Sequence, residues 1–160
     1  MEEKIKVVLW NCRSIVNNRE EFQNYLDEVK PQIVGLTETW LKPGRNLNFS
    51  GYEVFKCDRI NENGGGVAIL IQREISYNLV KINRFDNGNM ECVGIKILTK
   101  EGPLNFIFVY YPPRLFSKEG LQHYCSYFTG RLIVGGDFNA RHINWKSCWC
   151  IARRFYCRLQ

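Results

Sequence analysis

The stretch Arg131-Leu-Ile-Val-Gly-Gly-Asp-Phe-Asn139 is an apolar run that passes through two glycines into polar side chains. Side chains alternate across a strand, so Asp137 and Asn139 are predicted to share one side while Phe138 turns toward the core. The glycines lack side-chain bulk and would let a substrate approach the backbone. An aspartate so placed can take a proton from an attacking water, while the asparagine amide steadies a phosphate oxygen. An ordinary Asp-x-Asn turn explains this one segment equally well.

Three other apolar strands run directly into polar side chains of a catalytic type, namely Asn11, Glu38 and Tyr110. Open α/β sheets bind ligands at strand ends, because side chains leave the packed layers there. Glu38 is placed to hold Mg²⁺, which prefers one or two carboxylates with waters and substrate phosphates. A salt bridge or a helix cap is the commoner role of a lone Glu. Asn11 would orient a neighbour or contact a phosphate oxygen, or else serve as a turn residue.

Hydrophobic periodicity predicts strands and helices in alternation. In residues 18–30, apolar side chains recur at helical spacing and Pro31 follows as a stop. The predicted helices are residues 18–30 and 119–128, and the predicted strands are 5–10, 33–37, 52–57, 67–72, 75–82, 91–98, 105–111 and 131–134. This order of elements predicts a layered α/β domain.

Length and composition predict one globular domain. The chain has 160 residues, of which 45% are hydrophobic and 24% are charged, so disordered and fibrous classes are excluded. The longest apolar runs fall far short of the ~20 residues that span a bilayer. The acidic N-terminus does not have the pattern of a signal peptide, so we expect an intracellular protein with no membrane partner.

Charge and cysteine are concentrated toward the end of the sequence. The net charge is +6, and residues 131–160 hold six Lys or Arg against Asp137 alone, which indicates a polyanionic partner or a solvated tail. Seven cysteines is an odd number, so at least one thiol is expected to stay free. His142 with the cysteines of residues 148–157 raises the alternative of a zinc site, but the spacings match no common zinc finger.

Five short motifs together carry a family resemblance. They are Leu9-Trp10-Asn11-Cys12-Arg13-Ser14, Glu38-Thr39-Trp40-Leu41, Gly64-Gly65-Gly66-Val67-Ala68-Ile69, Val109-Tyr110-Tyr111-Pro112-Pro113 and Gly136-Asp137-Phe138-Asn139-Ala140. In this order, the chain resembles the endonuclease/exonuclease/phosphatase superfamily over about residues 5–146. It is most similar to the apurinic-type endonuclease domain of non-LTR (LINE-like) retrotransposons.

The resemblance implies a four-layer α/β sandwich of the DNase I-like type and cleavage of a DNA phosphodiester with Mg²⁺, with Mn²⁺ as an alternative ion. By position it makes Glu38 the metal ligand and Asn11 its active-site neighbour. Tyr110 would contact the phosphate, Asp137 would activate the water and Asn139 would help to hold the scissile group. In such elements the nick primes reverse transcription, which implies an adjoining reverse transcriptase domain, the element's RNA and a nuclear site of action.

One part of the family pattern has no match in the sequence. A late Ser-Asp-His segment is absent, and the only histidines are His123 and His142. We therefore expect an endonuclease-like domain in residues 1–146, incomplete at its C-terminus and weak or inactive, followed by a divergent Cys/Arg-rich tail in residues 147–160. Two alternatives remain open: a non-catalytic DNA-binding remnant, and a phosphoesterase of the same fold that acts on a phosphoinositide or a sphingolipid.

Overall fold

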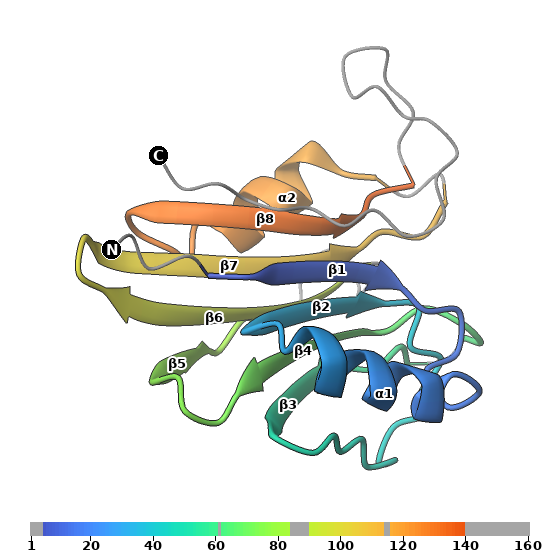
Figure 1. The fold of residues 1–160 in the computed structure, drawn as a ribbon. Coiled ribbons are helices and arrows are strands. Elements are labelled where there is room, and N and C mark those ends of the chain that lie inside the picture. Colours follow the sequence, from blue (N-terminus) through green and yellow to red (C-terminus); the bar gives the residue numbers. More distant parts are fainter. Residues whose placement is uncertain (1–4, 61, 84–89, 114–115, 140–160) are drawn as a thin grey trace.

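The computed structural model describes residues 5–60, 62–83, 90–113 and 116–139, and its elements follow the predicted order (Figure 1). They are β1 (Val7–Asn11), α1 (Arg19–Val29), β2 (Ile33–Thr37), β3 (Tyr52–Cys57), β4 (Val67–Gln72), β5 (Tyr77–Val80), β6 (Glu91–Thr99), β7 (Gly102–Tyr110), α2 (Lys118–Cys125) and β8 (Arg131–Asp137). The type of every predicted element is confirmed. The largest differences in extent are in β7, which begins three residues earlier than predicted, in β8, which continues through Asp137, in α2, which ends at Cys125, and in β5, which is shorter at both ends.

The strands form two sheets, with the orders β1-β2-β4-β3 and β5-β6-β7-β8. Each sheet contains one parallel pair, β1 with β2 and β7 with β8, and its other pairs are antiparallel. Parallel neighbours need a crossover connection, and the two helices supply it: α1 lies between β1 and β2 in the chain, and α2 between β7 and β8. The topology therefore places β1 and β8 outermost in their sheets.

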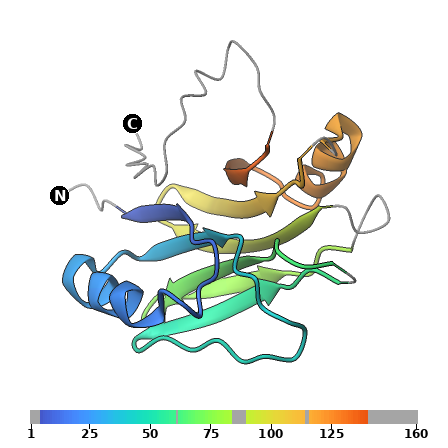
Figure 2. The ribbon, with the colours of Figure 1, turned by 90° about the vertical axis from the view of Figure 1, so that its right-hand side faces the viewer.

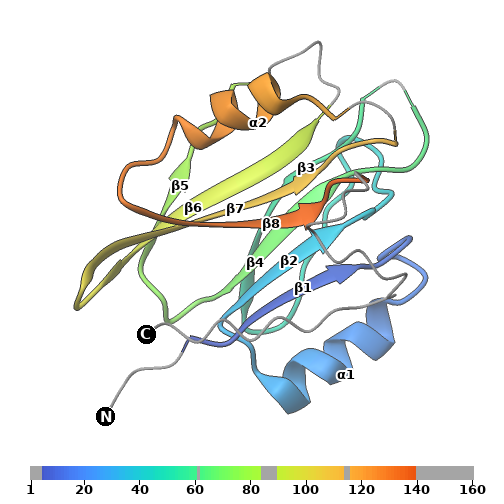
Figure 3. The same ribbon diagram turned by 90° about the horizontal axis from the view of Figure 1, so that it is seen from above.

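The sheets lie face to face, with a helix on each outer side (Figures 2 and 3). A central cluster joins the inner faces of both sheets through Ile69 and Phe106, while Leu26 of α1 and Tyr124 of α2 belong to separate outer clusters. All of β2 is buried, as expected for a strand covered on both faces. The helix–sheet–sheet–helix order confirms the predicted four-layer α/β sandwich.

Close packing between the sheets holds their strand ends near one another. A Cβ atom placed on Gly35 of β2 would lie 2.3 Å from the Phe108 ring of β7, and one on Gly135 of β8 would lie 3.0 Å from the same ring. The aromatic ring therefore occupies the space that two glycines leave open, and β2 and β8 approach one another around it. This contact brings the ends of the first sheet beside the end of β8.

Several sequence-based expectations fall outside the described residues. These are the zinc alternative at His142 with the late cysteines, and the divergent tail in residues 147–160. His123 lies on α2 with its ring near Tyr124 and Tyr127. In the part of the chain that the structure describes, no helix has both the length and the hydropathy of a membrane span.

Candidate active site

A single amide connects the carboxylates at the ends of two sheets. Asn11 is the last residue of β1, and its Nδ2 lies 2.9 Å from Oε1 of Glu38 and 2.9 Å from Oδ2 of Asp137. Glu38 directly follows β2, and Asp137 ends β8 in the other sheet. All three side chains are half-buried, and one neutral amide nitrogen contacts both acids.

The loop that carries Glu38 is held in an unusual backbone conformation. Glu38 and Trp40 have φ angles of 54° and 55°, in the left-handed region that bulky side chains rarely adopt. Such residues cost about 1–3 kcal/mol each and persist where the surroundings hold them. Here the carbonyl of Glu38 accepts from the Ser14 amide at 3.0 Å, and the Trp40 amide donates to the Gly65 carbonyl at 3.0 Å. The loop is thus fixed between the segment after β1 and the glycine run.

Tyr110 lies beside Asp137 in the second sheet. The strand register pairs Glu91 with Tyr110 and Tyr110 with Asp137, so the three residues form a row across β6, β7 and β8. Burial, followed by the charge of Glu38, raises the pKa of Tyr110 from 10.0 to about 12, against a lowering effect of Arg59. The phenol is therefore neutral at physiological pH and has a proton to donate.

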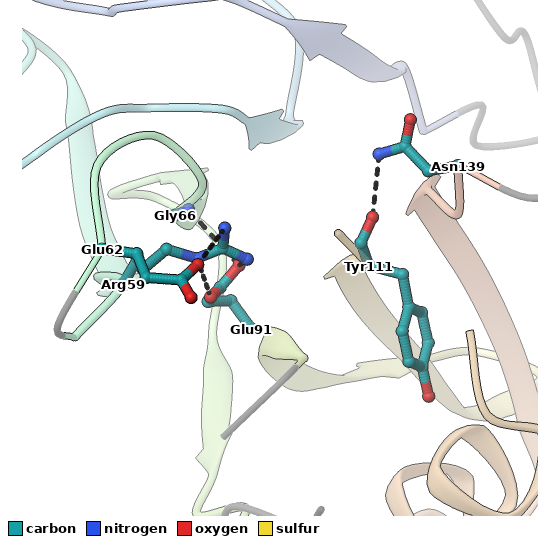
Figure 4. A network of polar contacts seen from close by, with 6 residues as sticks. All are labelled: Arg59, Glu62, Gly66, Glu91, Tyr111 and Asn139. Carbon is teal, nitrogen blue, oxygen red and sulfur yellow. Dashed lines mark hydrogen bonds and ion pairs between the residues drawn. The ribbon is translucent and has the colours of Figure 1, made fainter. Parts of the chain in front are cut away.

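Arg59 and Glu91 form a buried ion pair that the sequence analysis did not single out. Nε of Arg59 lies 2.8 Å from Oε1 of Glu91, Nη2 lies 3.3 Å from Oε2, and the Glu91 side chain is 1% exposed (Figure 4). The guanidinium carbon also lies 5.3 Å from the centre of the Tyr110 ring, within cation–π range. The signal in the sequence is weak: an Arg shortly before a glycine run, and a lone Glu at the start of an apolar strand.

Asn139 is close to Asp137, but its amide is already engaged. The backbone N–H of Asn139 donates to Oδ1 of Asp137 at 3.0 Å, and its Nδ2 donates to the Tyr111 carbonyl at 2.8 Å (Figure 4). Phe138 packs toward Tyr111 and the α2 cluster, as the alternation predicted. In this arrangement Asn139 orients the Asp137 carboxylate through its backbone and ties the end of β8 to β7.

The donor set at the strand ends fits a hard divalent cation. Glu38 and Asp137 offer carboxylate oxygens, and Oδ1 of Asn11 is buried without a hydrogen-bond partner among the described residues. Such oxygens are the ligands that Mg²⁺ prefers, with waters and substrate phosphates completing its coordination. Within residues 5–60, 62–83, 90–113 and 116–139, no cluster of three or more His, Cys, Asp or Glu could hold a metal ion.

Comparison with known proteins agrees with the four-layer sandwich and its acidic strand ends. A model of the Endonuclease/Exonuclease/phosphatase family matches residues 8–156. The chain therefore belongs to this family. The endonuclease domain of TRAS1, a telomere-specific non-LTR retrotransposon, has the same fold, with a TM-score of 0.65 and 20% identity over 89% of this chain and 64% of that chain.

Two relatives are polymerases of mobile elements. The RNA-directed DNA polymerase from the mobile element jockey of Drosophila funebris is 25% identical over 93% of this chain. The probable RNA-directed DNA polymerase from transposon BS of Drosophila melanogaster is 26% identical over 88%. In both cases the chain spans 16% of the relative's length. The resemblance to endonuclease domains of non-LTR retrotransposons is confirmed by these matches.

Proposed function

We propose that this chain is a DNA endonuclease domain that cleaves a phosphodiester bond weakly, with the help of a divalent cation, Mg²⁺ or Mn²⁺. The observation that carries the proposal is the Asn11 amide held between the carboxylates of Glu38 and Asp137, at 2.9 Å from each. It gathers two acids from different sheets at one edge of the fold, next to a protonated Tyr110. In-line attack on phosphorus needs such a combination of an acidic metal site, a base and a donor.

Each residue has a distinct part in this proposal. Glu38 would hold the cation, which when bound polarises the phosphate and neutralises developing charge. Asp137 would accept the proton of the attacking water, since its carboxylate is fixed by Asn11 and by the backbone of Asn139. Tyr110 would contact the phosphate by donating a hydrogen bond from its phenolic O–H to a phosphate oxygen. Asn11 would keep Glu38 and Asp137 at a constant separation.

The relatives support a wider role. Both are RNA-directed DNA polymerases of mobile elements, and the chain matches a small part of each. We therefore propose that the nick exposes a 3′-hydroxyl that primes reverse transcription of the element's RNA by an adjoining polymerase domain. Cleavage of chromosomal DNA would place this step in the nucleus.

The test is nicking of supercoiled plasmid in Mg²⁺ by the wild-type chain and by Glu38→Gln, which keeps the shape of the side chain but removes its charge. Glu20→Gln is the matched control, because Glu20 is an exposed carboxylate on α1. We expect Glu38→Gln to lower the nicking rate by about 100-fold or more and Glu20→Gln to leave it unchanged. Circular dichroism of each sample checks that the variants are folded.

Two outcomes would overturn the proposal. Nicking that persists in a chelator or in Glu38→Gln would show that this site does not carry the reaction. A folded wild-type chain that binds DNA without nicking would favour the non-catalytic alternative, because phosphate contacts by Lys and Arg need no catalytic group. Hydrolysis of a phosphoinositide or sphingomyelin in place of DNA would favour the phosphoesterase alternative.

A further inference from the structure

Aromatic residues near the site differ sharply in exposure. Tyr110 and Tyr111 are 6% and 1% exposed, and Trp10 packs against the α1 cluster. Trp40, in contrast, is 47% exposed, although a large indole in water forgoes the gain of burial. Its positive φ angle adds a backbone cost to this exposure. An exposed and strained Trp beside a carboxylate pair is therefore more in keeping with a binding role than with packing.

Trp40 forms one wall of a pocket of about 370 Å³, near the lower end of the range for small-ligand sites. The rest of the lining includes Lys42, Pro43, Arg59, Glu62, Asn63 and Gly64. A Cβ atom on Gly64 would lie 3.7 Å from Nε1 of Trp40, so the glycine leaves the indole edge accessible. The pocket combines a flat aromatic face with two cationic side chains and one carboxylate.

The pocket adjoins the carboxylate pair through two of its lining residues. Trp40 is two residues from Glu38, so their Cα atoms are at most about 7.6 Å apart. Arg59 lies 5.3 Å from the centre of the Tyr110 ring, which places this part of the lining against the second sheet of the site. Successive nucleotides of a DNA strand advance about 3.4 Å along the helix axis. The pocket therefore lies within a few nucleotide steps of a phosphate bound at Glu38.

The charges of the pocket also favour a nucleotide over a neutral apolar ligand. Lys42 is exposed at the rim, where its ammonium group can contact a backbone phosphate. Arg59 is held by Glu91, and its Nη1 lies 3.5 Å from Oε2 of Glu62 at the solvent side. The Arg59 position is therefore fixed by ion pairs, while the Trp40 face remains open for a planar group.

We propose that this pocket binds one base of the DNA strand next to the scissile phosphate, stacked on the indole of Trp40. The proposal rests on the proposed action on DNA. Stacking tolerates every base because each has a π face, so the pocket would add affinity and positioning without strong sequence preference. Lys42 would contact the phosphate of the same nucleotide.

The test compares two single-stranded probes of about ten nucleotides, one of thymidine and one of the same length with every base removed. Binding is measured by fluorescence anisotropy in a chelator, so that no cleavage occurs. We expect the wild-type chain to prefer the base-bearing probe by about 10-fold. Trp40→Ala should lose this preference and Trp40→Phe should keep most of it, with equal thermal midpoints showing that the exposed side chain does not stabilise the fold.

The results test base binding by the pocket separately from the proposed cleavage. Three results would overturn the proposal that the pocket binds a base. They are equal binding of the two probes by the wild-type chain, an unchanged preference in Trp40→Ala, and no binding of either probe. If plasmid is nicked in any of these cases, the proposed function stands without it. A base preference that depends on Trp40 in a chain that does not nick plasmid would support the pocket and overturn the proposed cleavage.

Discussion

Asn11 and Asp137 are separated by 126 positions in the chain and belong to different sheets, yet Nδ2 of one lies 2.9 Å from Oδ2 of the other. They end β1 and β8, each an outermost strand of its own sheet, so the contact joins the sheets at the edge where the site lies. The same nitrogen also contacts Glu38 at 2.9 Å. The integrity of the site therefore depends on one amide that keeps two acids together.

Replacing this amide by a third carboxylate should make the fold depend on a cation. In Asn11→Asp, three acids face one another without a donor, and like charges at this distance repel. We expect a chelator to lower the thermal midpoint of Asn11→Asp by about 3–6 °C relative to wild type, equivalent to about 1–2 kcal/mol, and Mg²⁺ to restore most of it. Thermal unfolding followed by circular dichroism, with and without Mg²⁺, measures this difference.

Asn11→Ala is the matched control for that variant. It removes the amide but adds no charge, so its midpoint should respond less to Mg²⁺ than that of Asn11→Asp. If the two variants show the same response, repulsion between carboxylates is not the cause, and the cation is bound elsewhere.

Gly136 controls how closely β8 approaches β7. A Cβ atom at this position would lie 2.0 Å from the Val109 carbonyl oxygen, so the backbone must shift to admit it. Gly136→Ala should lower the free energy of unfolding by about 2–3 kcal/mol. It should also reduce nicking in the fraction that remains folded, because Asp137 is the next residue. Denaturant unfolding and plasmid nicking on the same samples measure the two effects.

Gly130→Ala is the control for Gly136→Ala, because it adds backbone strain without a steric clash. Gly130 has a φ of +86°, and a Cβ atom added there would meet no heavy atom within 4 Å, so its substitution costs backbone strain alone, about 1–2 kcal/mol. Nicking by folded Gly130→Ala should match wild type. An equal loss of nicking in both variants would mean that the approach of β8 to β7 does not position Asp137.

The sequence predicted the strands, the helices and four of the polar strand ends because these depend on local periodicity. β2 and β4 are short apolar runs, and α1 is an amphipathic helix with Pro31 after it. The alternation in β8 placed Phe138 against the core and left Asp137 in the site. Local patterns of this kind need no knowledge of which strands pair.

The sequence could not show contacts that depend on tertiary pairing. Glu91 pairs with Tyr110 only because β6 and β7 lie side by side in one register, and Arg59 reaches both from the loop between β3 and β4. The engagement of the Asn139 amide by the Tyr111 carbonyl is also a tertiary contact. A lone acid or base has no periodicity, so its partner emerges only from the folded arrangement.

The Arg59–Glu91 pair should stabilise the fold and also position Tyr110. Arg59→Ala leaves the Glu91 carboxylate buried without its cation, which should lower the free energy of unfolding by about 3–5 kcal/mol. The double variant Arg59→Met with Glu91→Leu should recover most of this loss, since apolar replacements of a buried pair are often neutral. Denaturant unfolding of both variants tests the expectation.

If Arg59 only stabilises the fold, the double variant should recover nicking together with stability. We expect nicking to remain low there, because the cation over the Tyr110 ring is absent. Full recovery of nicking would show that Arg59 acts only on the fold and does not position Tyr110.

Tyr110 should make the fold sensitive to alkaline pH. Its pKa is about 12 in the folded chain, against 10.0 for an unperturbed tyrosine, so the folded state holds this proton more tightly. Between about pH 10 and 12 the folded state thus binds more protons than the unfolded state, and the free energy of unfolding falls as pH rises. Below pH ~10 the phenol is protonated in both states and contributes no slope.

Tyr110→Phe removes this titration and so should lose less stability than wild type as the pH rises through that window. Denaturant unfolding at a series of alkaline pH values measures the difference in slope. Tyr77→Phe is the matched control: the pKa of Tyr77 is also raised to about 12, but mainly by its hydrogen bond to Glu53, away from the site. Both substitutions should flatten the alkaline slope, whereas only Tyr110→Phe should reduce nicking at neutral pH, because only Tyr110 lies beside Asp137 and near Glu38. Equal nicking by Tyr110→Phe and wild type would exclude a donor role for Tyr110.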